Sequence, residues 1–182
     1  MEPISLSEAK LHLRITSTDD DTAITDDITA ARKIVESILG SQLITATLAL
    51  YLKDFPCSDI KLPYSPVQSV SSITYFDTNG SSQTLSTANY QVDTNDLPAK
   101  IKPAPTYVWP NVQTDRFNAI TITYIAGFGS SGSNVPAHIR QAIKIGVADL
   151  YEERQTGIVG TIRTETSTLH DLLVHDIIPM GD

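Results

Sequence analysis

The chain has 182 residues, of which 41% are hydrophobic and 19% are charged, and its net charge is −8 at pH 7. This composition allows a hydrophobic core and excludes a disordered chain. Because the sequence has no apolar run of roughly 18 residues, and no basic segment followed by an apolar one at its start, we expect neither a membrane helix nor a secretory signal.

The negative charge lies mainly at the two ends of the chain. Residues 1–40 contain eight acidic and four basic residues, residues 41–135 contain six and five, and residues 136–182 contain seven and four. Proteins that grip phosphate groups need clustered Lys and Arg, and this sequence has no such cluster. The charge pattern argues against specific nucleic-acid binding, while an acidic surface suits DNA that passes without adhering.

Two helices are predicted at the start of the chain. Ser5 and Glu8 fit a capping box, and the apolar residues after it predict a helix of about two turns. After a polar break, Asp19, Asp20 and Asp21 lie where a helix start favours negative charge. Apolar residues then recur at a 4-3-4-3 spacing up to Gly40, a typical helix cap, and they are Ile24, Ile28, Ala31, Val35 and Ile38. Two heptads favour core packing over a coiled coil.

The middle of the chain changes to a strand pattern. Alternation predicts strands near residues 48–52, 59–62, 70–77, 83–85, 90–92 and 120–124, and Asn79-Gly80 is a strong turn dipeptide. The proline-rich residues 93–118 predict an irregular ordered loop anchored by Trp109. A small-residue loop follows at 127–134, and Pro136 suits the first turn of a helix that reaches about Gln155.

These patterns predict an α+β protein. The N- and C-terminal helices form a small bundle, in which the long helix packs on the second helix, and a β-rich insertion lies between them. The expected divisions are residues 1–42 for the N-terminal helices, 43–127 for the insertion, 128–163 for the long helix that completes the bundle, and 164–182 for a C-terminal tail.

The glycine-rich stretch Gly127–Gly132 is the main candidate for a ligand site. It matches G-x-G-x-x-G, follows a strand and precedes a helix, as a dinucleotide fingerprint requires. However, no parallel βαβ unit follows, and the acids about 20 residues further on, Glu152 and Glu153, lie within a helix. A flexible loop is therefore favoured, and we expect no cofactor and no enzyme activity.

Other candidate chemistry is weaker. The four histidines have no metal-binding spacing, and the Asp runs at 19–21 and 26–27 lack the Gly and Glu of a calcium loop. Cys57 is the single cysteine, has no clear base partner, and fits a reducing cytoplasm. We therefore expect no metal site and no catalytic residue.

An ordered succession of motifs runs through most of the chain: Ser5-Leu6-x-Glu8-Ala9-Lys10-x-His12-Leu13-Arg14 before an Asp run, Ala30-Ala31-Arg32, Leu62-Pro63 with Pro66-Val67, Ile73-Thr74-Tyr75-x-Asp77, Trp109-Pro110, Thr123-Tyr124-x-Ala126-Gly127, Val135-Pro136-x-x-Ile139-Arg140 and Tyr151-Glu152-x-Arg154. In this succession the chain resembles the head–tail connector proteins of tailed phages, also called adaptors or head-completion proteins. The resemblance covers residues 5 to about 155, and residues beyond Thr156 depart most.

The resemblance implies a ring, commonly twelvefold, beneath the portal protein of a DNA-filled capsid. Such a ring extends the DNA channel, through which DNA passes without specific binding, and offers its far side to a stopper or tail terminator. The protein would then be made in the bacterial host cytoplasm and reside in the virion neck. The alternative is another neck or tail component, itself a stopper or tail terminator, although terminal helices of this size argue against a mostly β stopper. A nucleotide-binding enzyme is the third reading.

Two groups of residues are expected to mediate assembly. Apolar residues of the segment 164–182 are expected to bind the portal, so removing this segment should abolish portal binding and leave the fold intact; they are Leu169, Leu172, Leu173, Ile177 and Ile178. Charged residues of the long helix form either a solvated face or a salt-bridging face between subunits, namely Arg140, Lys144, Glu152 and Arg154.

Overall fold

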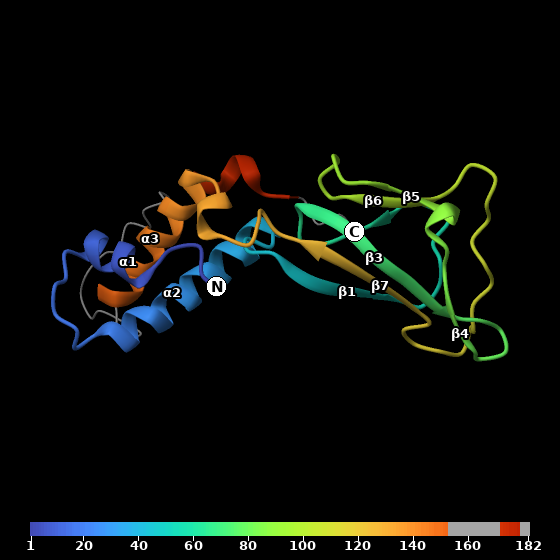
Figure 1. The fold of residues 1–182 in the computed structure, drawn as a ribbon, viewed down its shortest axis with the longest axis horizontal. Helices are drawn as coiled ribbons and strands as arrows, with labels where there is room; N and C mark the ends of the chain where they lie inside the picture. The colour runs from blue at the N-terminus through green and yellow to red at the C-terminus, as the bar shows by residue number, and fades with distance from the viewer. Residues whose placement is uncertain (153–171, 179–182) are drawn as a thin grey trace, which may run out of the picture. The chain divides into compact units, whose positions relative to one another are not determined.

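The computed structural model describes residues 1–152 and 172–178. The chain is a mixed α+β protein that divides into two compact units (Figure 1). The helical unit contains residues 1–39 together with described residues between 129 and 177, and the β-rich unit contains residues 40–128 and residue 178. The helical unit is thus assembled from two stretches of the chain that are far apart in sequence.

The capping box predicted at Ser5 is present. Helix α1 (Leu6–Leu13) begins where the Ser5 hydroxyl accepts from the Glu8 N–H, and the Glu8 carboxylate accepts from the Ser5 N–H at 2.9 Å. The helix ends at Arg14, whose left-handed backbone has φ 59°. Two backbone N–H groups at the helix start, those of Ser5 and Glu8, are therefore satisfied by side chains of the same turn.

Helices α2 (Asp21–Leu39) and α3 (Ala137–Glu152) pack against each other, and α1 packs on both. The apolar stripe predicted on α2 is buried at Ile24, Ile28, Ala31 and Val35. In its last turn Leu39 is buried, whereas the predicted Ile38 is only half-buried, because Leu39 lies four residues beyond Val35 on the face toward the core. Helix α3 contributes Ile139, Ala142, Ile143, Gly146 and Val147 to this core.

Two antiparallel sheets build the β-rich unit. One has the strand order β1-β7-β3-β4, with β1 at Ala46–Leu52, β3 at Val67–Phe76, β4 at Ser82–Thr84 and β7 at Ile120–Ala126. The other has the order β2-β6-β5, with β2 at Ile60–Lys61, β5 at Tyr90–Asp93 and β6 at Lys100–Pro103. A single hydrophobic cluster contains residues of both sheets, including Ile60, Ile73, Ile101, Ile122 and Tyr124.

One strand lies where the sequence predicted only a loop. Strand β6 pairs with both β2 and β5 inside the segment 93–118, and Ile101 is fully buried there. The sequence did not predict this strand because Ile101, between Lys100 and Lys102, is a single apolar residue, and one residue is too few to show an alternating pattern. Trp109 of the same segment stacks on Phe55, with ring centroids 4.6 Å apart, and packs against the core.

Candidate functional site

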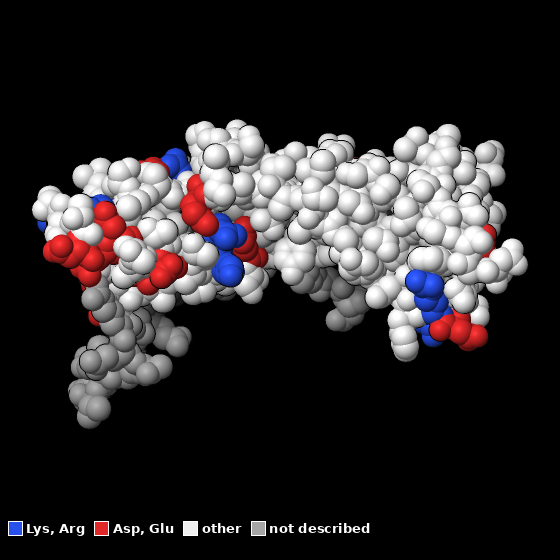
Figure 2. Space-filling view, turned by 60° about the horizontal axis from the view of Figure 1, so that its bottom comes forward, with Lys and Arg blue, Asp and Glu red and all other residues white. Residues whose placement is uncertain are grey.

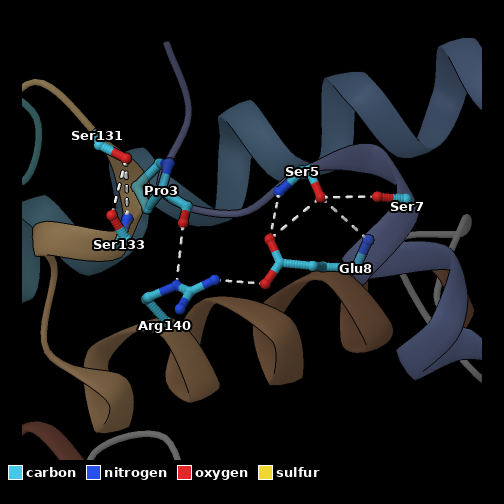
Figure 3. A network of polar contacts seen from close by, with 7 residues as sticks. All are labelled: Pro3, Ser5, Ser7, Glu8, Ser131, Ser133 and Arg140. Atoms are coloured by element: carbon cyan, nitrogen blue, oxygen red, sulfur yellow. Dashed lines mark hydrogen bonds and ion pairs between the residues drawn. The ribbon is translucent and has the colours of Figure 1, made fainter.

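A polar network joins the first residues of the chain to α3 (Figure 3). The Arg140 guanidinium donates to the Pro3 carbonyl at 3.2 Å and forms an ion pair with Glu8. Glu8 is held in turn by Ser5 of the capping box. The expected inter-subunit residue Arg140 therefore has its partners within its own chain, where it fastens the N-terminal segment to the helical unit.

The same network lowers the pKa of Glu8. The hydrogen bond from the Ser5 backbone is the largest cause, partial burial opposes it, and the Ser5 hydroxyl and the positive charges of Arg140 and Lys144 add to the lowering. The hydrogen bonds and the positive charges favour the carboxylate over the carboxylic acid, whereas burial favours the acid. Glu8 is therefore ionised at neutral pH and forms its ion pair with Arg140 of α3.

The glycine-rich stretch is shaped by packing within the chain. A side chain at Gly127 would collide with the backbone of Thr45, and one at Gly132 would collide with the Pro3 carbonyl. A 3-10 turn at Gly132–Asn134, capped by the Ser131 hydroxyl, follows in the same stretch. Because the strands of both described sheets pair antiparallel, the βαβ context of a dinucleotide site is missing from these sheets.

A groove of about 490 Å³ lies beside this turn. It is lined by residues 1–6, Glu8, Thr25, Ile28, Ser131–Ser133 and Arg140. The lining cation Arg140 is already paired with Glu8, and Glu2 adds a further carboxylate. A phosphate group would meet these carboxylates, so the groove does not fit a nucleotide.

The acidic start of α2 has internal partners. Lys10 donates to Asp21 at 2.6 Å, Tyr151 donates to Asp20 at 2.7 Å, and Ser17 donates to Asp19 at 2.5 Å. Among residues 1–152 and 172–178, no cluster of three His, Cys, Asp or Glu is arranged to hold a metal ion. Within the same ranges, no helix is both long and apolar enough to cross a bilayer.

The two sheets of the β-rich unit expose faces of opposite character. The exposed face of β5 and β6 is charged, and a hollow of about 680 Å³ there is lined by Asp59, Gln91, Val92, Asp93, Asn95, Asp96, Lys100 and Lys102. The outward face of the four-stranded sheet carries Thr47, Ala49 and Tyr51 on β1, Thr121, Thr123 and Ile125 on β7, and Ser69, Ser72 and Thr74 on β3. Figure 2 shows a surface of this unit without Lys, Arg, Asp or Glu except near one end.

A comparison with protein families decides the identity of the chain. The family model described as phage gp6-like head–tail connector protein matches residues 3–104, which is more than half of the chain. The chain belongs to this family. No curated protein sequence matches the connector.

Solved structures share the fold of the connector. One similar chain lies in the virion of a native gene transfer agent (GTA) particle, with 24% identity, a TM-score of 0.78, and coverage of 95% of this chain and 88% of that chain. A second lies in the neck of an empty GTA particle computed with C6 symmetry, with 23% identity, a TM-score of 0.79, and coverage of 96% and 89%. A third lies in the neck of a native GTA particle computed with C12 symmetry, with 21% identity, a TM-score of 0.72, and coverage of 92% and 86%.

The described residues 172–178 of the connector include one buried side chain and one contact with α3. Leu173 is fully buried, and His138 at the start of α3 contacts Asp176 at 2.6 Å. Val174 and Ile177 are exposed, while Leu172 and Ile178 are half-buried. Removing residues 164–182 would take away the buried Leu173, and the expectation that the fold stays intact after this deletion remains a prediction.

The remaining assembly residues are only partly described. Lys144 is half-buried near Glu8, and Glu152 is exposed at the end of α3. Leu169 and Arg154 lie outside the described residues. Sequence reasoning found the capping box at Ser5 but missed its link to Arg140, because the partner of Glu8 lies 132 positions away in the chain.

Proposed function

We propose that copies of this connector form a ring in the neck of a tailed phage or phage-like particle, directly beneath the portal protein. The family match carries this proposal. The similar chains in GTA necks support a cyclic arrangement, since those necks were computed with C6 and C12 symmetry. The proposed ring is dodecameric, extends the DNA channel, and presents a surface to a stopper or tail-terminator protein.

The charge distribution supports passage of DNA through such a ring. Acidic residues outnumber basic ones by eight to four in residues 1–40, the segment that contains α1 and α2. Several of the basic side chains there are paired with carboxylates, including Lys10 with Asp21 and Arg32 with Glu2 and Glu36. A surface of this kind repels the phosphate backbone and lets a duplex move without adhering.

The C-terminal segment is the proposed contact with the portal. Leu172, Ile177 and Ile178 are its predicted apolar contacts, the exposed Val174 adds to this surface, and Leu169 is included as a prediction from the sequence alone. Leu173 has a different part in this proposal: its burial and the His138–Asp176 contact fix the segment to the connector so that the neighbouring side chains are presented to the portal. Lys144, Glu152 and Arg154, and also Arg140 beside its contacts within the chain, stay predicted inter-subunit contacts.

Negative-stain microscopy and particle mass of the purified connector, alone and mixed with the portal protein of the same genome, test the proposal. We expect free rings or a ring added to the portal. A chain that stays monomeric in both samples and leaves the portal unchanged would contradict the ring.

A point variant tests the portal contact without removing Leu173. Ile177→Asp places a charge on an exposed apolar residue, so we expect weaker portal binding with an unchanged circular dichroism spectrum. Val108→Asp is the matched control, because Val108 is an exposed apolar residue of the β-rich unit. Equal portal binding by the two variants would exclude the C-terminal segment as the contact.

A further inference from the structure

The four-stranded sheet of the β-rich unit has two free edges. Its order is β1-β7-β3-β4, so β1 and β4 each have a neighbour on one side only. β1 is seven residues long, whereas the edge strands of the other sheet, β2 and β5, have two and four residues. A long edge strand is a ready template for another strand, and proteins that stay monomeric usually block it.

The direction of the backbone groups on β1 follows from the pairing of β7. The Phe76 N–H donates to the Ala119 carbonyl at 2.9 Å, so the backbone groups of Ala119 face β3. Because alternate residues of a strand face the same neighbour, the backbone groups of Thr121 and Thr123 also face β3. The residues between them, Ile122 and Tyr124 among others, must then bond to β1. Their β1 partners are Leu50 and Leu48.

The intervening residues of β1 therefore face outward. Thr47, Ala49 and Tyr51 direct their N–H and C=O groups to the free edge, because successive residues of a strand bond to opposite sides. Their side chains are exposed on the uncharged face of the sheet, and Leu48, Leu50 and Leu52 are half-buried at its margin. A strand added here would pair with three residues and cover the margin of the core.

The opposite edge is built in the same way. The Leu85 N–H donates to Ile73 at 2.8 Å and the Asp77 N–H donates to Ser81 at 2.9 Å, so Ser81, Gln83 and Leu85 bond to β3. Ser82 and Thr84, between them, direct their backbone groups outward. Their side chains are exposed.

Neither edge is protected by charged residues or proline, and β4 is limited only by its length of three residues. Residues 37–52, which include β1, contain no Lys, Arg, Asp or Glu, and the same is true of residues 78–92, which include β4. Neither stretch contains a proline. The charged residues of the second sheet, such as Lys100 and Asp93, show that this unit does place charges where a sheet faces solvent.

We propose that β1 of one connector pairs antiparallel with β4 of the next, so that the four-stranded sheets continue from copy to copy around the ring. This inference rests on the proposed function and names its subunit contact. Because the sheet has four antiparallel strands, its two edges run in opposite directions, and a second copy placed beside the first continues the alternation. The contact joins two different surfaces, as a closed ring of identical subunits requires, whereas β1 pairing with β1 would give a two-fold dimer.

Proline substitutions at outward positions test the pairing. Ala49→Pro and Thr84→Pro each remove an N–H that faces the free edge, while the bonds of these strands to β7 and β3 stay in place. We expect the concentration needed for ring formation to rise at least about tenfold. Ala49→Val and Thr84→Val are the matched controls, since they keep the N–H, and both should form rings as the wild type does.

A cross-linking experiment covers the case in which a proline variant fails to fold. In a Cys57→Ser chain, which removes the exposed native thiol, Ala49→Cys together with Thr84→Cys should give a ladder of covalent oligomers upon oxidation. Ala49→Cys combined with Gln91→Cys, on the other sheet, should give dimers at most. Undiminished ring formation by both folded proline variants would overturn the strand pairing and leave the proposed function standing. Wild-type rings without such a ladder would overturn the register that places Ala49 opposite Thr84. Absence of wild-type rings, with and without portal, would overturn both.

Discussion

The helical unit and the β-rich unit use charge in opposite ways. In the helical unit, three cations bind carboxylates that lie on other segments: Lys10 binds Asp21, Arg32 binds Glu2, and Arg140 binds Glu8. In the β-rich unit, the ion pair between described residues is Lys100–Asp96, which is local and exposed. The helical unit thus pairs its charged side chains internally, whereas the four-stranded sheet of the β-rich unit has two backbone edges that can pair with another strand.

The largest expected effect on stability comes from shortening a buried side chain in one unit at a time. Ile143→Ala in α3 and Ile122→Ala in β7 each remove a fully buried side chain, which costs about 2–5 kcal/mol of unfolding free energy. Urea unfolding can follow the helices by far-UV circular dichroism and the β-rich unit by Trp109, the single tryptophan. We expect Ile143→Ala to lower mainly the first midpoint and Ile122→Ala mainly the second. Equal shifts of both midpoints would show that the units unfold as one.

Alkaline pH is expected to weaken the β-rich unit selectively. Burial, with a smaller contribution from Tyr64, raises the pKa of Tyr124 to about 12 from an ordinary value of 10.0. The unfolded chain ionises first, so this contribution is complete below about pH 10 and is lost as pH rises toward 12, an effect of about 2–3 kcal/mol.

Tyr124→Phe is the control for this alkaline loss. The phenol donates to the Pro63 carbonyl at 2.7 Å, so the substitution costs about 1–2 kcal/mol at neutral pH. The variant should also be less sensitive than the wild type between pH 10 and 12, as measured by Trp109 fluorescence in urea. Identical alkaline slopes for the two proteins would assign the loss to other groups.

The smallest effect is expected from the Arg140 clamp of the helical unit. Arg140→Lys keeps the charge but loses the fork that reaches both Glu8 and Pro3, so we expect a loss of about 1 kcal/mol. The folded-state pKa of Glu8 is lowered, so its contribution is present above the ordinary value of 4.5 and is lost as pH falls through the lowered pKa. Thermal melts of both proteins should therefore converge in acid, and a constant difference down to acid pH would show that the fork acts by packing alone.

The sequence predicted those elements whose signal lies in residues close together in the chain. The capping box at Ser5, the stripe of α2 and the alternation of β7 each depend on residues within a few positions. Strand β6 escaped prediction because its single buried residue, Ile101, gains its environment from β2 and β5.

The assembly residues likewise combine features that the sequence shows locally with features that depend on tertiary packing. The apolar character of the C-terminal segment is visible in the sequence, but the burial of Leu173 is set by tertiary packing, and so is the use of Arg140 within its own chain. The free edges of the sheet were equally hidden, because the strand order β1-β7-β3-β4 pairs residues as far apart in the chain as Ala46 and Ala126.

The division of the helical unit between two stretches of chain has a consequence during synthesis. Helices α1 and α2 leave the ribosome first, but α3, which covers the apolar stripe of α2, begins only at Ala137. At about 5–20 residues per second, the intervening segment takes roughly 5–20 s to translate. The β-rich unit is continuous in sequence and can fold in that interval, while α2 waits with its stripe uncovered. The nascent chain is therefore most exposed to aggregation, and most in need of a chaperone, at the end that is made first.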